Sequence, residues 1–163
     1  MKKYFILTFL MFMPFFHYGQ LMELGSWRDH LPSRFIIDIY KNGDKIISVT
    51  EFNVFEYDLT TTETKIMSRS NYLSDVNISC SNYENQKLII AYDNCNLDII
   101  KEENVYNIPD IKNSQILGEK KINEIKIYDN TAYLASSFGI IELDLINLEI
   151  KNTFKISDTY NDV

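Results

Sequence analysis

The residue types best suited to chemistry stand together near the N-terminus, in the run Trp27-Arg28-Asp29-His30. Asp29 beside His30 has the composition of a general base with its orienting carboxylate. Neighbouring residues of an extended segment point to opposite faces, so these two side chains are not expected to form such a pair. We therefore predict a structural role for this run and no catalytic residue. Trp27, Arg28 and His30 are kept as candidate binding residues, because an arginine is suited to gripping a phosphate or carboxylate.

The two cysteines, Cys80 and Cys95, are the next candidates for chemistry. Their spacing matches no zinc-binding pattern, and a single histidine follows residue 19, so we predict no metal site. No nucleophile elbow of the Gly-x-Ser-x-Gly kind is present, and no phosphate-binding loop, so no cofactor is predicted. An oxidising compartment would permit a disulfide between the two cysteines. Two small, half-buried free thiols are the alternative, and the sequence leaves both open.

Acidic residues are frequent but scattered, and none follows the spaced pattern of a calcium-binding loop. We interpret them as solvated residues of turns and strand edges. The set comprises Glu84, Asp93, Asp98, Glu102, Glu103, Asp110, Glu119 and Asp129. With 16 basic and 23 acidic residues the net charge is −7, so the chain is not expected to bind nucleic acid electrostatically.

The first residues have the pattern of a secretory signal peptide. Lys2 and Lys3 are followed by the 13 uncharged residues of Tyr4–Phe16. Such a run is too short to cross a bilayer, which takes a helix of about 20 residues. We predict a signal peptide over residues 1–19 and an exported mature chain over residues 20–163.

The mature chain contains a repeat with a period of about forty-three residues. The segments Lys45–Asp58, Lys87–Ile100 and Thr131–Asp144 align, with Asn53, Cys95 and Gly139 at equivalent turn positions. Each segment predicts two strands around that turn: Ile46–Thr50 and Val54–Asp58, Leu88–Tyr92 and Asn96–Ile100, Ala132–Ser136 and Ile140–Asp144. An apolar run precedes each pair, at Ile36–Tyr40, Val76–Cys80 and Ile122–Tyr128. A fourth run follows, at Thr64–Met67, Val105–Ile108 and Ile150–Ile156.

Four short strands at a period of ~40–45 residues are typical of a β-propeller blade. We therefore predict an all-β fold with blades at about 35–75, 76–121 and 122–157; a β-sandwich with accidentally similar hairpins is the alternative. Closed propellers have roughly 4–8 blades. Three blades thus predict a partial propeller, and the chain is interpreted as the N-terminal fragment of a longer protein.

The turns of the repeat carry two further expectations. Asn53, Cys95 and Gly139 are expected in the left-handed backbone region, where a cysteine carries strain of ~1–2 kcal/mol unless the turn type has changed. Asp58 and Asp144 are expected to end their strands in turns where the carboxylate binds nearby backbone amides.

Several ordered strings make the repeat more specific: Gly25–Pro32, Leu73–Val76, Leu88–Ile100, Tyr106–Lys112 and Phe138–Asp144. Together they resemble the N-terminal β-propeller of PorZ-like proteins of the type IX secretion system. The resemblance implies a protein with two seven-bladed propellers and a C-terminal sorting domain. It also implies protein partners in an attachment complex at the outer membrane, and a role in presenting anionic lipopolysaccharide to a sortase. In this chain Cys95 stands where the family usually has glycine.

The resemblance predicts a non-enzymatic, exported interaction module of the periplasm or the outer-membrane surface. Its expected partners are proteins of the secretion complex, with an anionic glycolipid as a further candidate ligand. The periplasmic sensor propeller of a hybrid two-component regulator is the alternative, because such propellers use similar Leu-Ser-Asp blade entries. An enzyme built on a propeller would need paired carboxylates facing one pocket, which the sequence does not establish.

Overall fold

The computed structural model describes residues 35–116 and 118–155 of the 163-residue chain. The predicted signal peptide and the candidate binding residues Trp27, Arg28 and His30 lie outside the described residues, so those assignments stay predictions.

In the part of the chain that the structure describes, twelve strands form three separate four-stranded antiparallel sheets, each with its strands in chain order. Blade 1 comprises β1 (Ile36–Asn42), β2 (Lys45–Thr50), β3 (Asn53–Asp58) and β4 (Thr64–Ser68). Blade 2 comprises β5 (Ile78–Glu84), β6 (Lys87–Tyr92), β7 (Leu97–Lys101) and β8 (Asn104–Ile108). The one-turn helix α2 (Asp110–Asn113) precedes blade 3, which comprises β9 (Ile122–Tyr128), β10 (Thr131–Ser136), β11 (Gly139–Asp144) and β12 (Glu149–Phe154).

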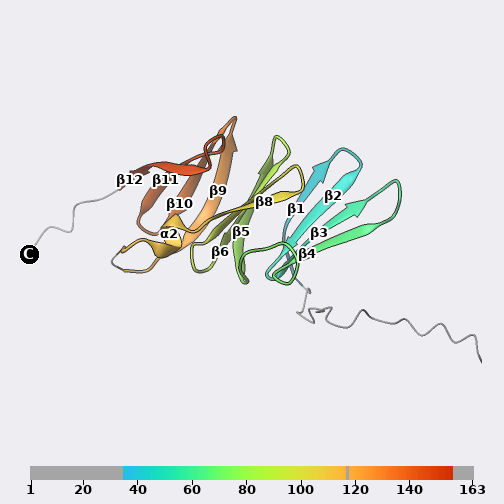
Figure 1. Cartoon of the computed structure of the whole chain (residues 1–163), viewed down its shortest axis with the longest axis horizontal. Helices are drawn as coiled ribbons and strands as arrows, with labels where there is room; N and C mark the ends of the chain where they lie inside the picture. Colours follow the sequence, from blue (N-terminus) through green and yellow to red (C-terminus); the bar gives the residue numbers. More distant parts are fainter. Residues whose placement is uncertain (1–34, 117, 156–163) are drawn as a thin grey trace, which may run out of the picture.

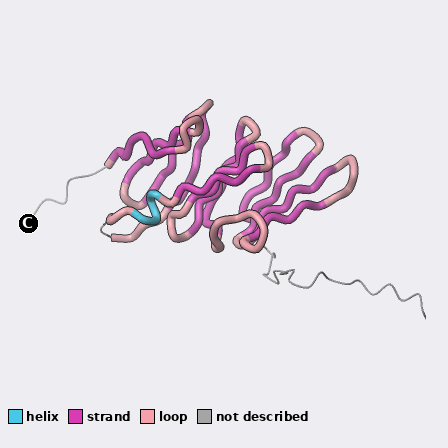
Figure 2. Tube along the Cα trace, in the orientation of Figure 1, coloured by secondary structure: helices cyan, strands magenta, loops and turns pink. Residues whose placement is uncertain are grey.

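The three sheets stand side by side in chain order, as Figures 1 and 2 show. Their first strands are neighbours, because β5 contacts both β1 and β9. Hydrogen bonds join these strands across the blades: Ser81 Oγ donates to Asp38 at 2.7 Å, and Cys80 Sγ donates to the carbonyl oxygen of Ile122 at 3.7 Å. First strands gathered on one side of successive four-stranded sheets are the arrangement of a β-propeller around its axis. The fold is therefore an all-β partial propeller, as predicted.

Two hydrophobic cores fill the spaces between the blades. The first joins Ile47 and Val49 of blade 1 to blade 2, and the second joins blade 2 to Leu134 and Leu143 of blade 3. Strand β6 belongs to both: Leu88, Ile90 and Tyr92 enter the first core, whereas Ile89 and Ala91 enter the second. Successive side chains of a strand point to opposite faces, so a strand between two sheets must be apolar on both. This explains why every residue of β6 is buried.

Among the described residues, nothing covers one apolar face of each outer sheet. Ile39 of blade 1 is 65% exposed, and Tyr128 of blade 3 is 63% exposed. The ring of Tyr128 packs against Tyr133, a neighbour on its own sheet, with the ring centroids 6.1 Å apart. Uncovered faces at both ends of the array agree with the prediction of an incomplete propeller.

The predicted strands are found with small shifts, and the largest shift is in blade 2. The apolar run Val76–Cys80 was expected to be its first strand, but β5 starts at Ile78 and continues to Glu84. The expected strand Asn96–Ile100 is β7, which starts one residue later at Leu97. The hairpin registers explain this second shift. Four residues separate the paired Val49 and Val54, whereas five separate the paired Ala91 and Leu97.

Because the turn of blade 2 is one residue longer than that of blade 1, Asn53 and Cys95 are not equivalent turn positions in the structure, although the sequence alignment pairs them. Cys95 has φ +61° and Gly139 has φ +141°, so both adopt the expected positive φ. The prediction for Asn53 is wrong, because Asn53 is not among the residues with positive φ and begins β3. Its amide donates to Thr50 Oγ1 at 3.0 Å, so a side chain supports the turn without a left-handed residue.

Candidate interaction site

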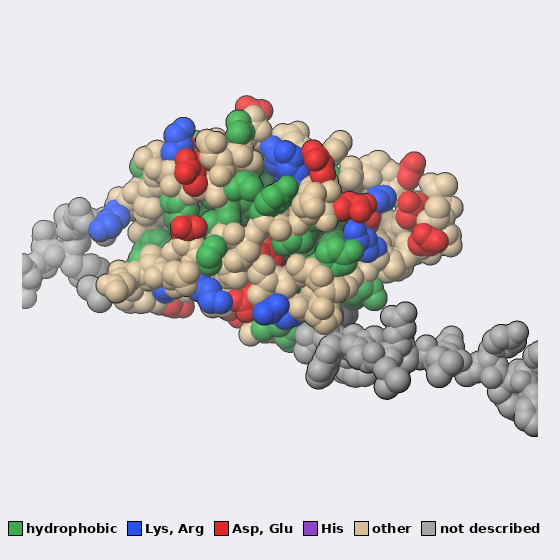
Figure 3. All heavy atoms as spheres, viewed as in Figure 1, with side chains coloured by type: hydrophobic (Ala, Val, Ile, Leu, Met, Phe, Trp, Pro, Cys, Tyr) green, Lys and Arg blue, Asp and Glu red, His purple; other side chains and the backbone are tan. Residues whose placement is uncertain are grey.

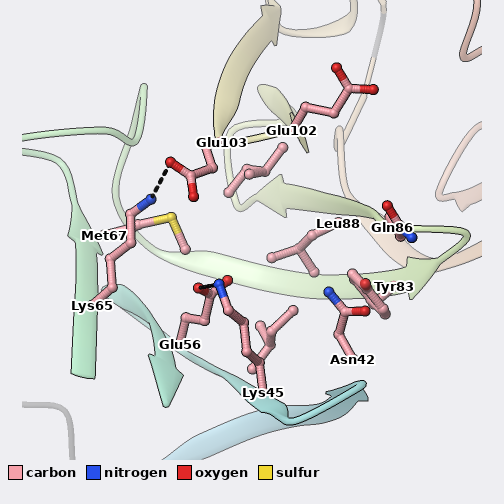
Figure 4. Close-up of a pocket in the computed structure, with 12 residues that line it drawn as sticks. Asn42, Lys45, Glu56, Lys65, Met67, Tyr83, Gln86, Leu88, Glu102 and Glu103 are labelled. Atoms are coloured by element: carbon pink, nitrogen blue, oxygen red, sulfur yellow. Dashed lines mark hydrogen bonds and ion pairs between the residues drawn. The ribbon is translucent and has the colours of Figure 1, made fainter. Parts of the chain in front are cut away.

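A small pocket opens between blades 1 and 2, at the ends of their hairpins. It encloses about 150 Å³. Its apolar part consists of side chains from the first inter-blade core and its border, namely Ile47, Met67, Leu88 and Ile100. Polar side chains form the rest of the lining, and all of them are labelled in Figure 4: Asn42, Lys45, Glu56, Lys65, Tyr83, Gln86, Glu102 and Glu103.

The pocket carries charges of both signs. Lys45 Nζ donates to Glu56 Oε1 at 2.7 Å, and this hydrogen bond raises the pKa of Lys45. Lys65 Nζ lies 3.7 Å from Glu103 Oε2, and the Glu103 side chain is 77% exposed. Figure 4 marks both contacts with dashed lines. Ion pairs this exposed add little to stability, so Glu103 keeps most of its charge available to solvent.

Tyr83 brings a buried hydroxyl group to this pocket. The hydroxyl oxygen is buried and has no hydrogen-bond partner among the described residues. Its ring packs against Tyr40, with the ring centroids 5.8 Å apart, which holds the side chain in place. Burial raises the pKa of Tyr83, with a smaller contribution from the charge of Glu56. The hydroxyl therefore stays protonated and is able both to donate and to accept a hydrogen bond.

On the opposite ends of the sheets, Asp98 of β7 forms a polar network inside blade 2. Asp98 is fully buried, so its interpretation as a solvated acid is wrong. Its Oδ2 accepts hydrogen bonds from Tyr92 Oη at 2.6 Å and from the Ser74 amide at 2.7 Å, and its Oδ1 accepts one from Asn107 Nδ2 at 2.9 Å. These bonds join the link between blades 1 and 2 to the body of blade 2. The other seven acidic residues of that set are exposed, as predicted.

Asp75 connects three loops beside that network. Its Oδ2 accepts hydrogen bonds from Lys112 Nζ at 2.7 Å and from Asn94 Nδ2 at 2.6 Å. Burial acts to raise the pKa of Asp75, but these donors outweigh burial and lower the pKa to about 2. Asp75 thus remains ionised and ties the inter-blade link to helix α2 and the β6–β7 turn.

The predicted turn carboxylates are confirmed. Asp58 Oδ1 accepts hydrogen bonds from the amides of Thr60 and Thr61, at 2.8 and 3.0 Å. Asp144 Oδ1 does the same with Ile146 and Asn147, at 2.7 and 3.1 Å. These amide bonds are the main cause of the lowered pKa of each carboxyl. Both carboxylates therefore stabilise the conformation of their turns.

Both cysteines are free thiols in the structure. Of the two possibilities left open by the sequence, a disulfide or two free thiols, the second is found. Cys95 is fully buried and Cys80 is half-buried. Burial raises the pKa of the Cys80 thiol to about 11. Within residues 35–116 and 118–155, no three His, Cys, Asp or Glu side chains lie together as metal ligands would. No helix in these ranges has the length and apolar character needed to cross a bilayer.

Sequence reasoning did not single out the pocket, because its lining comes from two blades. Glu102 and Glu103 stood only among the scattered acids, and Tyr83–Gln86 follows the pattern of a polar hairpin link. The pocket could have been inferred from the positions of these residues in the repeat. The hairpins of neighbouring blades end on the same side of a propeller, which brings hairpin residues of two blades together.

Comparison with known proteins gives a consistent result. The family model described as the N-terminal β-propeller domain of PorZ, a type IX secretion protein, matches residues 46–163. Among solved structures, PorZ of Porphyromonas gingivalis is 32% identical with a TM-score of 0.65. The match covers 71% of this chain and 16% of that one, so the chain spans about a sixth of the length of PorZ. That protein is described as an essential bacterial surface component of the type IX secretion system.

Two more distant structures share the fold alone. Both are extracellular domains from B. thetaiotaomicron. BT4673, assigned as a one-component system, is 12% identical with a TM-score of 0.57, covering 72% of this chain and 16% of its own. BT3049, assigned as a hybrid two-component system, is 15% identical with a TM-score of 0.52 and the same coverage of both chains. No curated protein sequence matches the chain.

Proposed function

The chain belongs to the family of PorZ N-terminal β-propeller domains, and from that membership we propose that it is a non-enzymatic interaction module of a type IX secretion attachment complex. The observation that carries the proposal is the 32% identity to PorZ over 71% of this chain, which is well above the identity to the sensor domains. The predicted signal peptide supports export to the periplasm or the outer-membrane surface.

Docking to proteins is the part of this role that the surface supports best. The described hairpin ends carry more carboxylates than lysines, and the whole chain has a net charge of −7. Such a surface attracts basic protein segments and repels anionic lipids. We propose that any presentation of anionic lipopolysaccharide to a sortase uses a surface other than these hairpin ends.

Crosslinking in intact cells tests the proposal. A lysine-reactive crosslinker is added to cells that produce the natural full-length protein, and the crosslinked peptides are identified by mass spectrometry. We expect the protein in the outer-membrane fraction, with crosslinks to other type IX secretion components. Recovery in the inner-membrane fraction, crosslinked to a kinase or a transcriptional regulator, would support the sensor alternative and overturn the proposal.

The positions of the lysines make the experiment informative about orientation. Lys41 and Lys101 lie at hairpin ends, whereas Lys112 and Lys121 lie on the segment between blades 2 and 3. Crosslinks from the first pair place the partner at the hairpins, and crosslinks from the second pair place it at the opposite ends of the sheets.

A further inference from the structure

The two ends of the sheets differ in charge. We define the hairpin face as residues 41–45, 58–63, 84–87, 101–104, 128–131 and 144–149, which connect the first strand to the second and the third to the fourth in each blade. This face carries nine acidic residues: Asp44, Asp58, Glu63, Glu84, Glu102, Glu103, Asp129, Asp144 and Glu149. It carries four lysines: Lys41, Lys45, Lys87 and Lys101. In Figure 3 acidic side chains gather at the right-hand end of the molecule, and acidic and basic side chains alternate along its upper edge.

The opposite face is close to electrical balance. The described residues of its connections, at 50–53, 69–77, 93–96, 109–121 and 137–138, carry five acidic residues: Glu51, Asp75, Asp93, Asp110 and Glu119. Four cations accompany them: Arg69, Lys112, Lys120 and Lys121. On the hairpin face, by contrast, one of the four lysines is withdrawn from the surface, because Lys87 is buried and donates to Asn130 Oδ1 at 2.9 Å. The negative potential therefore belongs to the hairpin face.

The pocket between blades 1 and 2 opens on this face. Glu102 and Glu103 form the two-residue turn between β7 and β8 and stand on its border. Their side chains are 76% and 77% exposed, and the nearest lysine nitrogens are 4.0 and 3.7 Å away. Both carboxylates are thus presented to solvent at the entrance and are only weakly neutralised.

The interior of the pocket adds an apolar surface, because its lining of Ile47, Leu88 and Ile100 suits an aliphatic chain. A volume of about 150 Å³ is below the ~300–1,000 Å³ of a drug-sized ligand site. The space suits a single long side chain.

We infer that this pocket receives a lysine or arginine side chain from a partner protein. The aliphatic part of the side chain lies on Leu88 and Ile100, and its cationic end meets the carboxylates of Glu102 and Glu103 at the entrance. The acidic hairpin face surrounding the pocket attracts the basic segment that carries this side chain. The inference rests on the proposed docking function and adds the chemistry of the partner.

The inference is tested by nuclear magnetic resonance with a defined probe. The peptide acetyl-Gly-Ser-Arg-Ser-Gly-amide is titrated into the isotope-labelled full chain, and the same peptide with citrulline in place of arginine serves as the neutral control. We expect saturable shifts of the amides of Gln86, Leu88, Glu102 and Glu103 with the arginine peptide. Binding should weaken as salt rises from 0.05 to 0.5 M, because salt screens exposed charges.

Two pairs of substitutions separate the pocket from the general charge of the face. Glu102→Gln with Glu103→Gln should weaken binding about three- to tenfold, as expected for two exposed ion pairs. Glu63→Gln with Asp129→Asn removes the same charge from the hairpin face outside the pocket, and should change binding less than twofold. Tyr83→Phe should leave binding unchanged, because the Tyr83 hydroxyl oxygen is buried and out of reach of an incoming side chain.

The outcomes that overturn the inference are distinct from those that overturn the proposed function. Equal shifts with arginine and citrulline, shifts outside the pocket, or no saturable shift would refute the basic-side-chain pocket. Equal effects of the two charge-removing pairs would also refute it, since attraction would then be unspecific. If crosslinking in cells still identified secretion partners, the docking function would stand with a different contact site.

Discussion

The Tyr92→Phe substitution tests whether the buried Asp98 network stabilises the link between blades. The ring of Tyr92 is fully buried, so phenylalanine keeps the packing and removes only the hydroxyl that donates to Asp98 Oδ2 at 2.6 Å. Hydrogen bonds to charged groups contribute roughly 1.5–3 kcal/mol. Asp98 keeps its bonds from Ser74 and Asn107, so we expect a loss of about 2 kcal/mol in the free energy of unfolding.

Urea unfolding followed by circular dichroism measures this loss. With slopes of ~1–3 kcal/mol per molar urea, the midpoint should fall by about 1 M and the slope should stay unchanged. Tyr106→Phe is the matched control, because Tyr106 is an exposed tyrosine of the same blade and should change stability by less than ~0.5 kcal/mol. If the two substitutions had equal effects, the view that Asp98 depends on the Tyr92 hydroxyl would be refuted.

Three further predictions concern single residues. Because its folded-state pKa is lowered to about 2, Asp75 should contribute about 2 kcal/mol of stability at neutral pH. Asp75→Asn should therefore reduce the loss of stability that the parent chain shows as the pH falls from about 4 towards 2, measured by urea unfolding at each pH, while the part due to Asp58 and Asp144 remains. Gly139→Ala should cost at least ~2 kcal/mol, since φ is +141° and a Cβ would collide with the carbonyl oxygen of Phe154, whereas Gly43→Ala meets open space and should cost only ~1 kcal/mol. Alkylation of Cys80 by iodoacetamide at pH 8 should be about a hundredfold slower than in the urea-unfolded chain, because its pKa is raised to about 11 and the thiolate is the reactive form.

Each of these predictions has an outcome that contradicts its physical reason. Equal acid sensitivity of Asp75→Asn and the parent would show that this carboxylate is not selectively stabilised. Equal costs for the two glycine substitutions would mean that the close approach at Gly139 is absent. Rapid alkylation of the folded chain would show that the Cys80 thiol is accessible, and a mass two units lower than the reduced chain would show a disulfide.

The sequence predicted the architecture because, in this fold, the pattern of apolar residues along each strand follows from the place of that strand in its blade. Alternating apolar residues in each repeat report which strand faces a neighbouring blade, and the unbroken apolar run of β6 reports burial on both sides. The glycine at 139 and the carboxylates at Asp58 and Asp144 were predictable for a similar reason, since their turns use bonds and backbone angles within a few residues of chain.

What the sequence did not predict depends on partners far apart in the chain. Asp98 looks like any other acid, and its donors Tyr92 and Ser74 lie 6 and 24 residues away. The sequence alignment concealed it further, because it places Asp98 opposite the acids Glu56 and Glu142. Only the register of the structure shows that Asp98 faces Ile90 at the place where blade 3 has Ile141 facing Leu134. An acid at an apolar position of a repeat indicates a buried polar network. The pocket at Tyr83 gave no such signal, since it exists only when two blades are packed together.

The burial of β6 on both faces determines how the array should come apart. Removing blade 1 or blade 3 strips one hydrophobic cluster and leaves the other closed, whereas extracting β6 opens both at once. The two outer sheets should therefore unfold locally before the middle sheet does. The amides of Ile89 and Ile90 should be among the last to exchange with solvent. Mutational tolerance should follow the same gradient, because every apolar side chain of β6 lies in one of the two hydrophobic cores and no position of this strand faces solvent.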